Sequence, residues 1–431
     1  MTPTITARLG ALLVVAAIIV ACGPSTPSAA PSATTGPTPT VAPTPDPTAT
    51  PDPSASQDPD AIWDAIEEQV LALRGLDRVD VEREAIDEDE LVRIVTELFD
   101  TDYPESYVLA TERLYKALGL MEEDASLRTL YLDLIGASVA GFYRPEVKKL
   151  YVVSRSGTIG AADKLTFAHE YTHALQDATF QYWDDADDLL DQTDQGLARA
   201  GLSEGDATFL MFQWAQAGNL SPAEITEYLE SANDPEQTAI LERTPAILTE
   251  PLLFPYTTGL QFLLAIQGED GWPAVDAAYD RPPTTTEQVI HPEKYEAAEP
   301  AVEVEIPDDA AGRMGDGWSI AMEDTWGELQ TRIWLTETGQ GATADVAAAG
   351  WGGDRLAVLT GPDGAWAVVL DTRWDTTADE EEFLDAALAA TATLEHPANV
   401  SSSGDGDVTV MIASDDAALV SLDRIFGDTG A

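Results

Sequence analysis

A His-Glu-Tyr-Thr-His motif at residues 169–173 constrains the fold of this chain more than any other segment. It lies in a stretch, 164–178, that contains neither proline nor glycine, and Asp163 is expected to be the N-cap of a helix there. Helical residues four apart lie about one turn above each other, so His169 and His173 share one face. Two imidazoles at that spacing can bind a single metal ion.

Glu170 is expected to act on water rather than to bind the metal. It lies about a third of a turn from His169, which places its carboxylate beside the water that the ion activates. Two of the four histidines in this 431-residue chain fall in the motif, and the single cysteine lies far from it. The site must therefore be completed by carboxylates, and the pattern favours Zn²⁺.

The third ligand must come from downstream of the motif. A run of aspartates follows it: Asp184, Asp185, Asp187, Asp188, Asp191 and Asp194. Charge runs of this kind are usually solvated faces. Glu204 instead begins a strongly apolar helical stretch, and a carboxylate carried into a core is costly unless it meets a cation. The sequence therefore predicts Glu204 as the third metal ligand.

The motif and the Glu-Gly-Asp-Ala sequence that begins at Glu204 together resemble the gluzincin class of zinc metallopeptidases. Segments beginning at Pro282 and Gly350 are similar to segments of bacterial zincin-like lipoproteins. The resemblance covers about residues 130–300. It implies that Glu204 on a second helix completes a zinc site, that strands near 141–153 align an extended peptide, and that the reaction is hydrolysis of peptide bonds.

Thr208 departs from this resemblance. In thermolysin-like gluzincins an aspartate lies four residues after the glutamate ligand, where this chain has Thr208. A ligating histidine usually donates its other ring N–H to a carboxylate. Asp177 and Asp206 are the two candidates for that partner, and the sequence does not decide between them.

His291 is the candidate for stabilising an oxyanion, a role that His or Tyr plays in the enzymes this chain resembles. The alternative is that His291 makes a hydrogen bond that holds its loop. Tyr256 is a second candidate for the oxyanion role, although packing explains it more simply.

The first 60 residues predict a secreted, anchored protein. Arg8 precedes an apolar run at 9–20, which suits a signal peptide, and the run ends at Cys22 in a sequence that resembles the bacterial lipobox. Residues 23–60 are rich in Pro, Thr and Ser, as expected for an extended stalk. We therefore expect residues 1–22 to be a lipoprotein signal peptide. Acyl chains on Cys22 would anchor the protein at the outer face of the cytoplasmic membrane.

The remaining chain predicts an α+β fold in two parts. Residues 61–300 form the zincin-like domain, mainly helical with a short β-hairpin near 141–153. Residues 301–431 form a smaller α+β domain of unknown role. Helices are expected at 88–99, 105–118, 126–139, 326–336 and 378–391. Strands are expected at 318–322, 356–360, 366–372 and 408–413.

The charge excludes one class of partner. The chain has 77 acidic against 22 basic residues, a formal charge of −55, which is incompatible with a nucleic-acid surface. The expected partners are a peptide or protein substrate and, through Cys22, the membrane. An alternative of another class is a catalytically inactive zincin fold that serves as an envelope binding lipoprotein. Glu170 favours the enzyme, because a purely structural metal site needs no base beside it.

Overall fold

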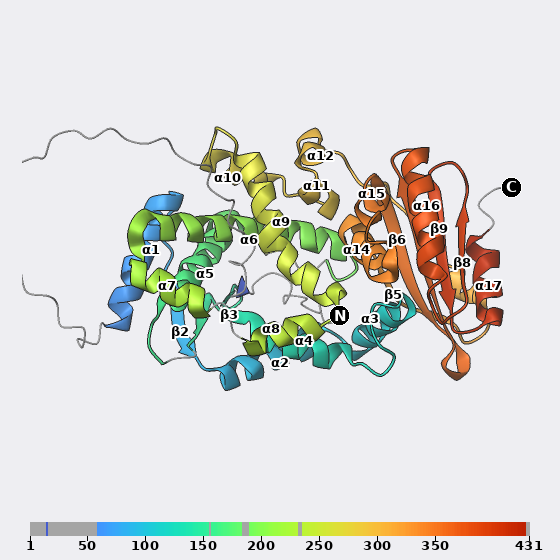
Figure 1. Cartoon of the computed structure of the whole chain (residues 1–431), viewed down its shortest axis with the longest axis horizontal. Helices are drawn as coiled ribbons and strands as arrows, with labels where there is room; N and C mark the ends of the chain where they lie inside the picture. Colours follow the sequence, from blue (N-terminus) through green and yellow to red (C-terminus); the bar gives the residue numbers. More distant parts are fainter. Residues whose placement is uncertain (1–13, 16–57, 155–156, 183–188, 232–234, 428–431) are drawn as a thin grey trace, which may run out of the picture.

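The computed structural model (Figure 1) describes residues 14–15, 58–154, 157–182, 189–231 and 235–427. Helices predominate and two separate β-sheets accompany them, which confirms the α+β class. Within these ranges no helix combines the length and the apolarity needed to cross a bilayer. Cys22 and most of the predicted stalk lie outside the described residues.

The first sheet contains the predicted hairpin. Its order is β1-β3-β4-β2, with strands β1 (Val14–Val15), β2 (Glu82–Ile86), β3 (Val139–Arg144) and β4 (Lys149–Val153). β3 and β4 are antiparallel, and β2 joins the far side of β4 in parallel. The two-residue strand β1 pairs antiparallel with β3 at Val139 and Gly141. β1 therefore occupies the outer edge of β3.

Helices make up most of the chain before residue 300. They are α1 (Pro59–Arg74), α2 (Glu88–Asp102), α3 (Glu105–Ala117), α4 (Leu127–Ser138), α5 (Ala161–Phe180), α6 (Thr193–Trp214), the π-helix η3 (Ala215–Asn219), α7 (Pro222–Ser231), α8 (Pro235–Arg243), α9 (Ala246–Gln267), α10 (Trp272–Asp280), α11 (Thr286–Ile290) and α12 (Pro292–Ala297). The helices predicted at 88–99, 105–118 and 126–139 are confirmed as α2, α3 and α4. Ser126 and Asp87 begin two of them as N-caps, because their side chains accept from backbone N–H groups of the first turn.

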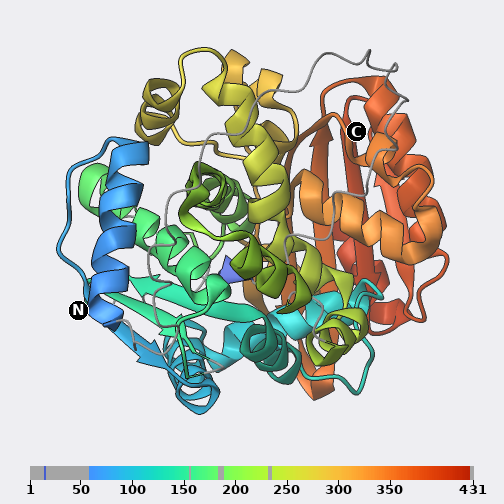
Figure 2. The same cartoon turned by 60° about the vertical axis from the view of Figure 1, so that its left-hand side comes forward.

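The long helices α6 and α9 cross with their backbones in direct contact. A Cβ added at Gly205 would lie 2.5 Å from the carbonyl oxygen of Gly259, and one added at Gly259 would lie 2.4 Å from that of Gly201. Any larger residue at these positions would force the two helices apart. In Figure 2 the yellow helix α9 lies between the green helices α5 and α6 and the orange C-terminal part of the chain.

The second sheet lies at the opposite end of the molecule from α1 (Figure 1) and is antiparallel throughout, with the order β5-β6-β7-β9-β8. Its strands are β5 (Ser319–Asp324), β6 (Trp351–Thr360), β7 (Trp366–Trp374), β8 (Ala398–Ser402) and β9 (Asp407–Ala413). The helical segments around it are α13 (Ala310–Met314), α14 (Gly327–Leu335), η4 (Thr336–Gln340), α15 (Ala344–Ala348), η5 (Pro362–Gly364), α16 (Thr377–Thr391) and α17 (Asp416–Phe426). The predicted strands and both predicted helices of this part are confirmed.

Alternate residues of this sheet face different partners. Leu356 and Val358 on β6 belong to a core that includes Phe383 of α16, whereas Ala357 and Leu359 pack with α13 and α17. This is the two-residue period of a strand buried on both faces. The first of these cores continues without a break into the helices before residue 300. The two parts of the chain therefore share one hydrophobic core.

Three buried aspartates lie where the start of α6 meets the C-terminal part. Asp354, in the segment beginning at Gly350, accepts from the backbone N–H groups of Trp326 and Gly327, each at 2.7 Å. Asp324 accepts from the N–H of Thr193 at 2.8 Å. Burial raises the pKa of Asp324 to about 7 and that of Asp354 to about 6.

Asp194, the second residue of α6, is the most strongly perturbed of the three. Its Oδ1 accepts from the N–H of Thr286 at 3.1 Å, while Oδ2 has no partner among the described residues. Burial raises its pKa to about 8. The carboxyl group therefore binds its proton more tightly in the folded state than in the unfolded chain, so stability is lost as the pH rises from about 4 towards 8.

Asp194→Asn should reduce this loss of stability, because the amide keeps the Oδ1 acceptor and cannot ionise. Between about pH 6 and pH 8 the wild type should lose more unfolding free energy than the variant does. The difference should be a fraction of the roughly 1.4 kcal/mol per pH unit that one titrating group contributes. Chemical denaturation at several pH values measures it. Asp363→Asn, at an exposed turn, is the matched control for loss of one surface charge. Equal pH slopes for wild type and Asp194→Asn would contradict the assignment.

Candidate metal centre

Helix α5 carries the motif, and its start differs from the prediction. The N-cap is Gly160, three residues before Asp163, and Asp163 instead closes a capping box by accepting from the Gly160 N–H at 2.7 Å. The prediction of Asp163 as N-cap was wrong because an acidic side chain at the third helical position also satisfies the helix start. From 165 to 177 every residue of α5 is buried, so the motif lies inside the molecule and not on a surface.

The structure brings His169, His173 and Glu204 together. The Nε2 atom of His169 lies 2.9 Å from Oε2 of Glu204, and the Nε2 atom of His173 lies 3.2 Å from the same oxygen. The two Nε2 atoms are 3.1 Å apart. All three side chains are at most 3 % exposed. These residues, which we call the triad, could hold a metal ion.

The charges of the triad are coupled. Burial acts to raise the pKa of Glu204, but the charge of His173 and hydrogen bonds from both imidazoles lower it overall. Burial acts to lower the pKa of His173, and the charge of Glu204 outweighs it, so that pKa is raised. Burial lowers the pKa of His169. A carboxylate thus stays ionised in a dry interior only because cationic or donor groups face it.

Glu170 is fully buried beside the triad. Neither of its carboxylate oxygens has a side-chain hydrogen-bond partner among the described residues, and only the backbone N–H of Tyr143 faces the group. Burial raises its pKa well above the usual range, and the charge of His173 only partly offsets this. The strand β3 passes close by, since a Cβ at Gly141 would lie 3.5 Å from Cγ of Glu170. Glu170 therefore lies between the triad and the sheet edge.

Asp177 and Asp206 were the two candidates for a carboxylate partner of the histidines, and Asp206 is the one connected to the triad by hydrogen bonds. Nδ1 of His173 lies 2.8 Å from Oε1 of Gln176, and the amide of Gln176 donates to Asp206 at 3.1 Å. Asp177 instead accepts from the hydroxyl of Tyr143 and from Lys148. The sequence analysis missed Gln176, although its place three residues after His173 on the same helix put it within reach.

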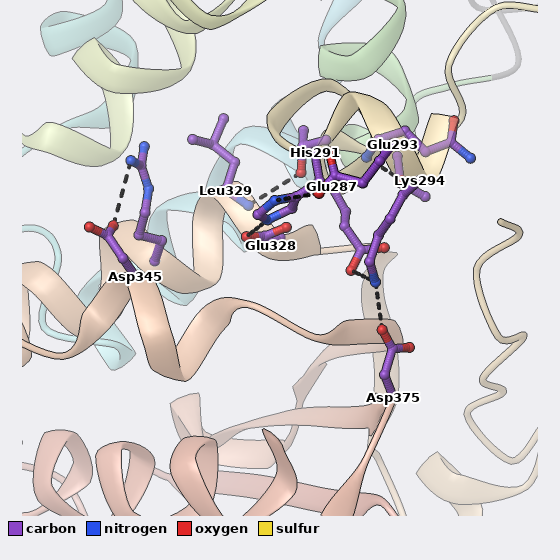
Figure 3. A network of polar contacts seen from close by, with 12 residues as sticks. Glu287, His291, Glu293, Lys294, Glu328, Leu329, Asp345 and Asp375 are labelled. Carbon is purple, nitrogen blue, oxygen red and sulfur yellow. Dashed lines mark hydrogen bonds and ion pairs between the residues drawn. The ribbon is translucent and has the colours of Figure 1, made fainter. Parts of the chain in front are cut away.

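His291 contacts the C-terminal part of the chain (Figure 3). It lies between α11 and α12, and its Nε2 atom is 2.9 Å from Oε1 of Glu328 on α14. Its ion-pair partners among the described residues are Glu328 and Glu293, and neither belongs to the triad. The hydrogen bond of the alternative interpretation is therefore present. The oxyanion role of His291 stays a prediction that its contacts do not support.

Tyr256 on α9, the second candidate for that role, does reach the triad. Its ring centroid is 6.0 Å from that of His169, and its side chain is buried. Burial raises its pKa well above the usual range, and the charges of Glu204 and Glu170 add to this. Its phenol therefore remains a protonated donor at any working pH. The contact between α6 and α9 at Gly205 and Gly259 accounts for this position.

The competing aspartates lie elsewhere. Asp191 is largely exposed and pairs with Arg355. Asp194 lies at the buried junction described above. Those at 184–188 are outside the described residues. Glu204 is thus the carboxylate that the described structure places with the two histidines.

A second set of carboxylates surrounds Lys294 (Figure 3) and so already contains a cation. The oxygens of Glu287, Glu299 and Asp375 are close enough to share an ion. Nζ of Lys294 lies 2.6, 2.8 and 2.5 Å from them, respectively. The ammonium group thus takes the place of a metal and joins α11 and α12 to the loop after β7.

One comparison with known proteins gives a match. Residues 319–425 match a domain of unknown function (DUF8575), which covers the second sheet and its helices from β5 to α17. No curated protein and no solved structure matches the chain. The match lies outside the elements that carry the triad.

Proposed function

We propose that this protein is a lipid-anchored, extracytoplasmic zinc metallopeptidase that hydrolyses peptide bonds with Glu170 as the general base. The observation that carries the proposal is the fully buried carboxylate of Glu170 beside the triad, with no side-chain hydrogen-bond partner among the described residues. Burying a carboxyl group that no cation or donor side chain pairs with costs stability, so an apolar residue would serve a purely structural role better. This argues against the alternative of an inactive binding protein.

The donor set of the triad fits zinc. Two imidazole nitrogens and one carboxylate oxygen are the ligands of many catalytic zinc sites, which leave a fourth position open. For Zn–ligand distances near 2.0–2.1 Å, ligand atoms at the corners of a tetrahedron lie about 3.3 Å apart. The three observed distances between donor atoms, 2.9, 3.1 and 3.2 Å, are close to that value.

Zinc at this site would lower the pKa of a water molecule and polarise the scissile carbonyl group. Glu170 would take the proton of that water and later deliver it to the leaving amine. Burial raises the pKa of Glu170, which makes its carboxylate a stronger proton acceptor than an exposed glutamate is. Tyr256, as a protonated phenol, is the group we assign to hydrogen-bond the oxygen that gains negative charge.

The outer edge of β3 is the proposed binding site for the substrate backbone. β1 pairs with this edge at Val139 and Gly141, and β1 belongs to the predicted signal peptide, whose removal would leave the edge open to a substrate. Peptides commonly bind by adding a strand to an exposed sheet edge. Because β3 lies against α5 at Gly141, a peptide on this edge would pass close to Glu170.

Glu170→Gln should keep zinc and lose hydrolysis by roughly a hundredfold or more, since the amide cannot accept the proton of water. The measurement is cleavage of a proteome-derived peptide library by the purified protein, with bound zinc measured in parallel. Glu337→Gln, at an exposed position, is the control. Unchanged turnover in Glu170→Gln would remove this residue from the mechanism. A zinc-loaded wild type that cleaves no peptide would favour the binding protein.

Cys22→Ser should release the protein from the membrane fraction or leave its signal peptide uncleaved, because the lipid anchor requires the thiol. Ser25→Ala, three residues along the chain, should change neither property. Fractionation of cells with mass spectrometry of the mature N-terminus measures both. A Cys22→Ser protein that is processed and membrane-bound like the wild type would show that the anchor assignment is wrong.

A further inference from the structure

The orientation of the Gln176 amide is determined by its partners. Its nitrogen donates to the carbonyl oxygen of Ser203 at 3.0 Å and to Oδ2 of Asp206 at 3.1 Å. Both partners can only accept, so the nitrogen must face them and the amide oxygen must face Nδ1 of His173. Nδ1 of His173 therefore carries the proton and donates at 2.8 Å. In the neutral ring, Nε2 then presents its lone pair to the triad.

Asp206 is held in turn by a buried cation. Its two oxygens accept from Nε and Nη2 of Arg74, each at 3.2 Å, and from the hydroxyl of Tyr279 at 2.8 Å. The side chains of Arg74 and Asp206 are fully buried. The guanidinium also stacks over Trp272, 4.4 Å from the ring centroid. A chain of contacts thus runs from α1 and α10 through α6 to the metal-binding face of α5.

We propose that Gln176 is a positioning residue for His173, and that Asp206 and Arg74 hold Gln176 in the orientation that this role requires. The inference rests on the proposed function, because it assumes that the triad binds zinc. A ligating histidine usually donates to a carboxylate directly. In this chain a neutral amide takes that place, and the carboxylate lies one hydrogen bond further from the metal ligand.

His169, the other histidine of the triad, differs from His173 in the surroundings of its Nδ1 atom. Nδ1 of His169 is buried and has no hydrogen-bond partner among the described residues. The hydroxyl of Thr208, which stands where the resemblance expects an aspartate, is also buried and unpartnered there. The direct carboxylate partner is therefore absent from the described surroundings of His169. Among the described residues, the support of a triad histidine by a hydrogen bond at Nδ1 is therefore the one that Gln176 gives to His173.

The same network could instead serve only to pack α5 against α6. Removing a buried hydrogen bond would then lower stability and leave zinc affinity unchanged. If Gln176 positions His173, its removal should lower zinc affinity more than the removal of a hydrogen bond that lowers stability equally. Tyr279 provides the comparison, because Tyr279→Phe removes one hydrogen bond to Asp206 and leaves both bonds of Gln176 in place.

The test is zinc affinity, measured by chelator competition, together with the melting temperature of the metal-free protein. Gln176→Met keeps the volume but cannot accept from His173, so zinc affinity should fall about 10- to 100-fold. Gln176→Glu keeps an oxygen that accepts from Nδ1 of His173, so it should lose less zinc affinity than Gln176→Met does. Tyr279→Phe should lower the melting temperature as much as Gln176→Met does and leave zinc affinity unchanged.

The outcomes distinguish failure of the positioning role from failure of the proposed function. If the wild type binds zinc and Gln176→Met binds it equally well, the positioning role is wrong while the proposed function stands. If the wild type binds no zinc, the proposed function and the positioning role both fall. Should Gln176→Met fail to fold, Asp206→Asn carries the test, since it keeps one acceptor oxygen but loses the ion pair with Arg74. Wild-type zinc affinity in Asp206→Asn would then overturn the proposal.

Discussion

The contact between α5 and α6 buries four ionisable side chains together, and the arrangement of the first half of the chain depends on it. Glu170 and Glu204 lie in a dry interior beside His169 and His173, where an uncompensated carboxylate would be strongly destabilising. A bound cation would satisfy the triad. The surrounding packing has little freedom, because glycines bring β3 against α5 and α9 against α6 at backbone contact distance.

The C-terminal part supports this centre and is not merely attached to it. It holds the first residues of α6 through Asp324 and Thr325, which accept from the backbone N–H groups of Thr193 and Asp194, and Lys294 joins α12 to the loop after β7. Since Glu204 lies about three turns along α6 from Asp194, the same rigid helix connects this junction to the triad. The matched domain of unknown function at 319–425 therefore contributes to the placement of Glu204, a residue that it does not itself contain.

Local patterns predicted the triad and most elements, whereas the partners of the triad required tertiary structure. His169 and His173 follow from helical spacing, and Glu204 from the cost of a buried charge. The Gln176 relay ends at Arg74, 132 residues from Asp206 in sequence, so no local pattern could indicate it. His291 suggested a catalytic role by its chemistry alone, but the packing of α11 on α14 directs it to Glu328. No local pattern indicated that Tyr256 lies beside His169, because its approach depends on glycines in two separate helices.

The central claim is that His169, His173 and Glu204 together hold one zinc ion. The most direct measurement is the zinc content of the purified protein after dialysis against a weak chelator, for the wild type, Glu204→Gln and the exposed control Asp191→Asn. We expect one zinc per chain in the wild type and in the control. In Glu204→Gln we expect a loss of zinc affinity greater than the roughly 10- to 100-fold that follows removal of a residue hydrogen-bonded to a ligand. A wild type without zinc, or a Glu204→Gln variant that retains it fully, would contradict the zinc site.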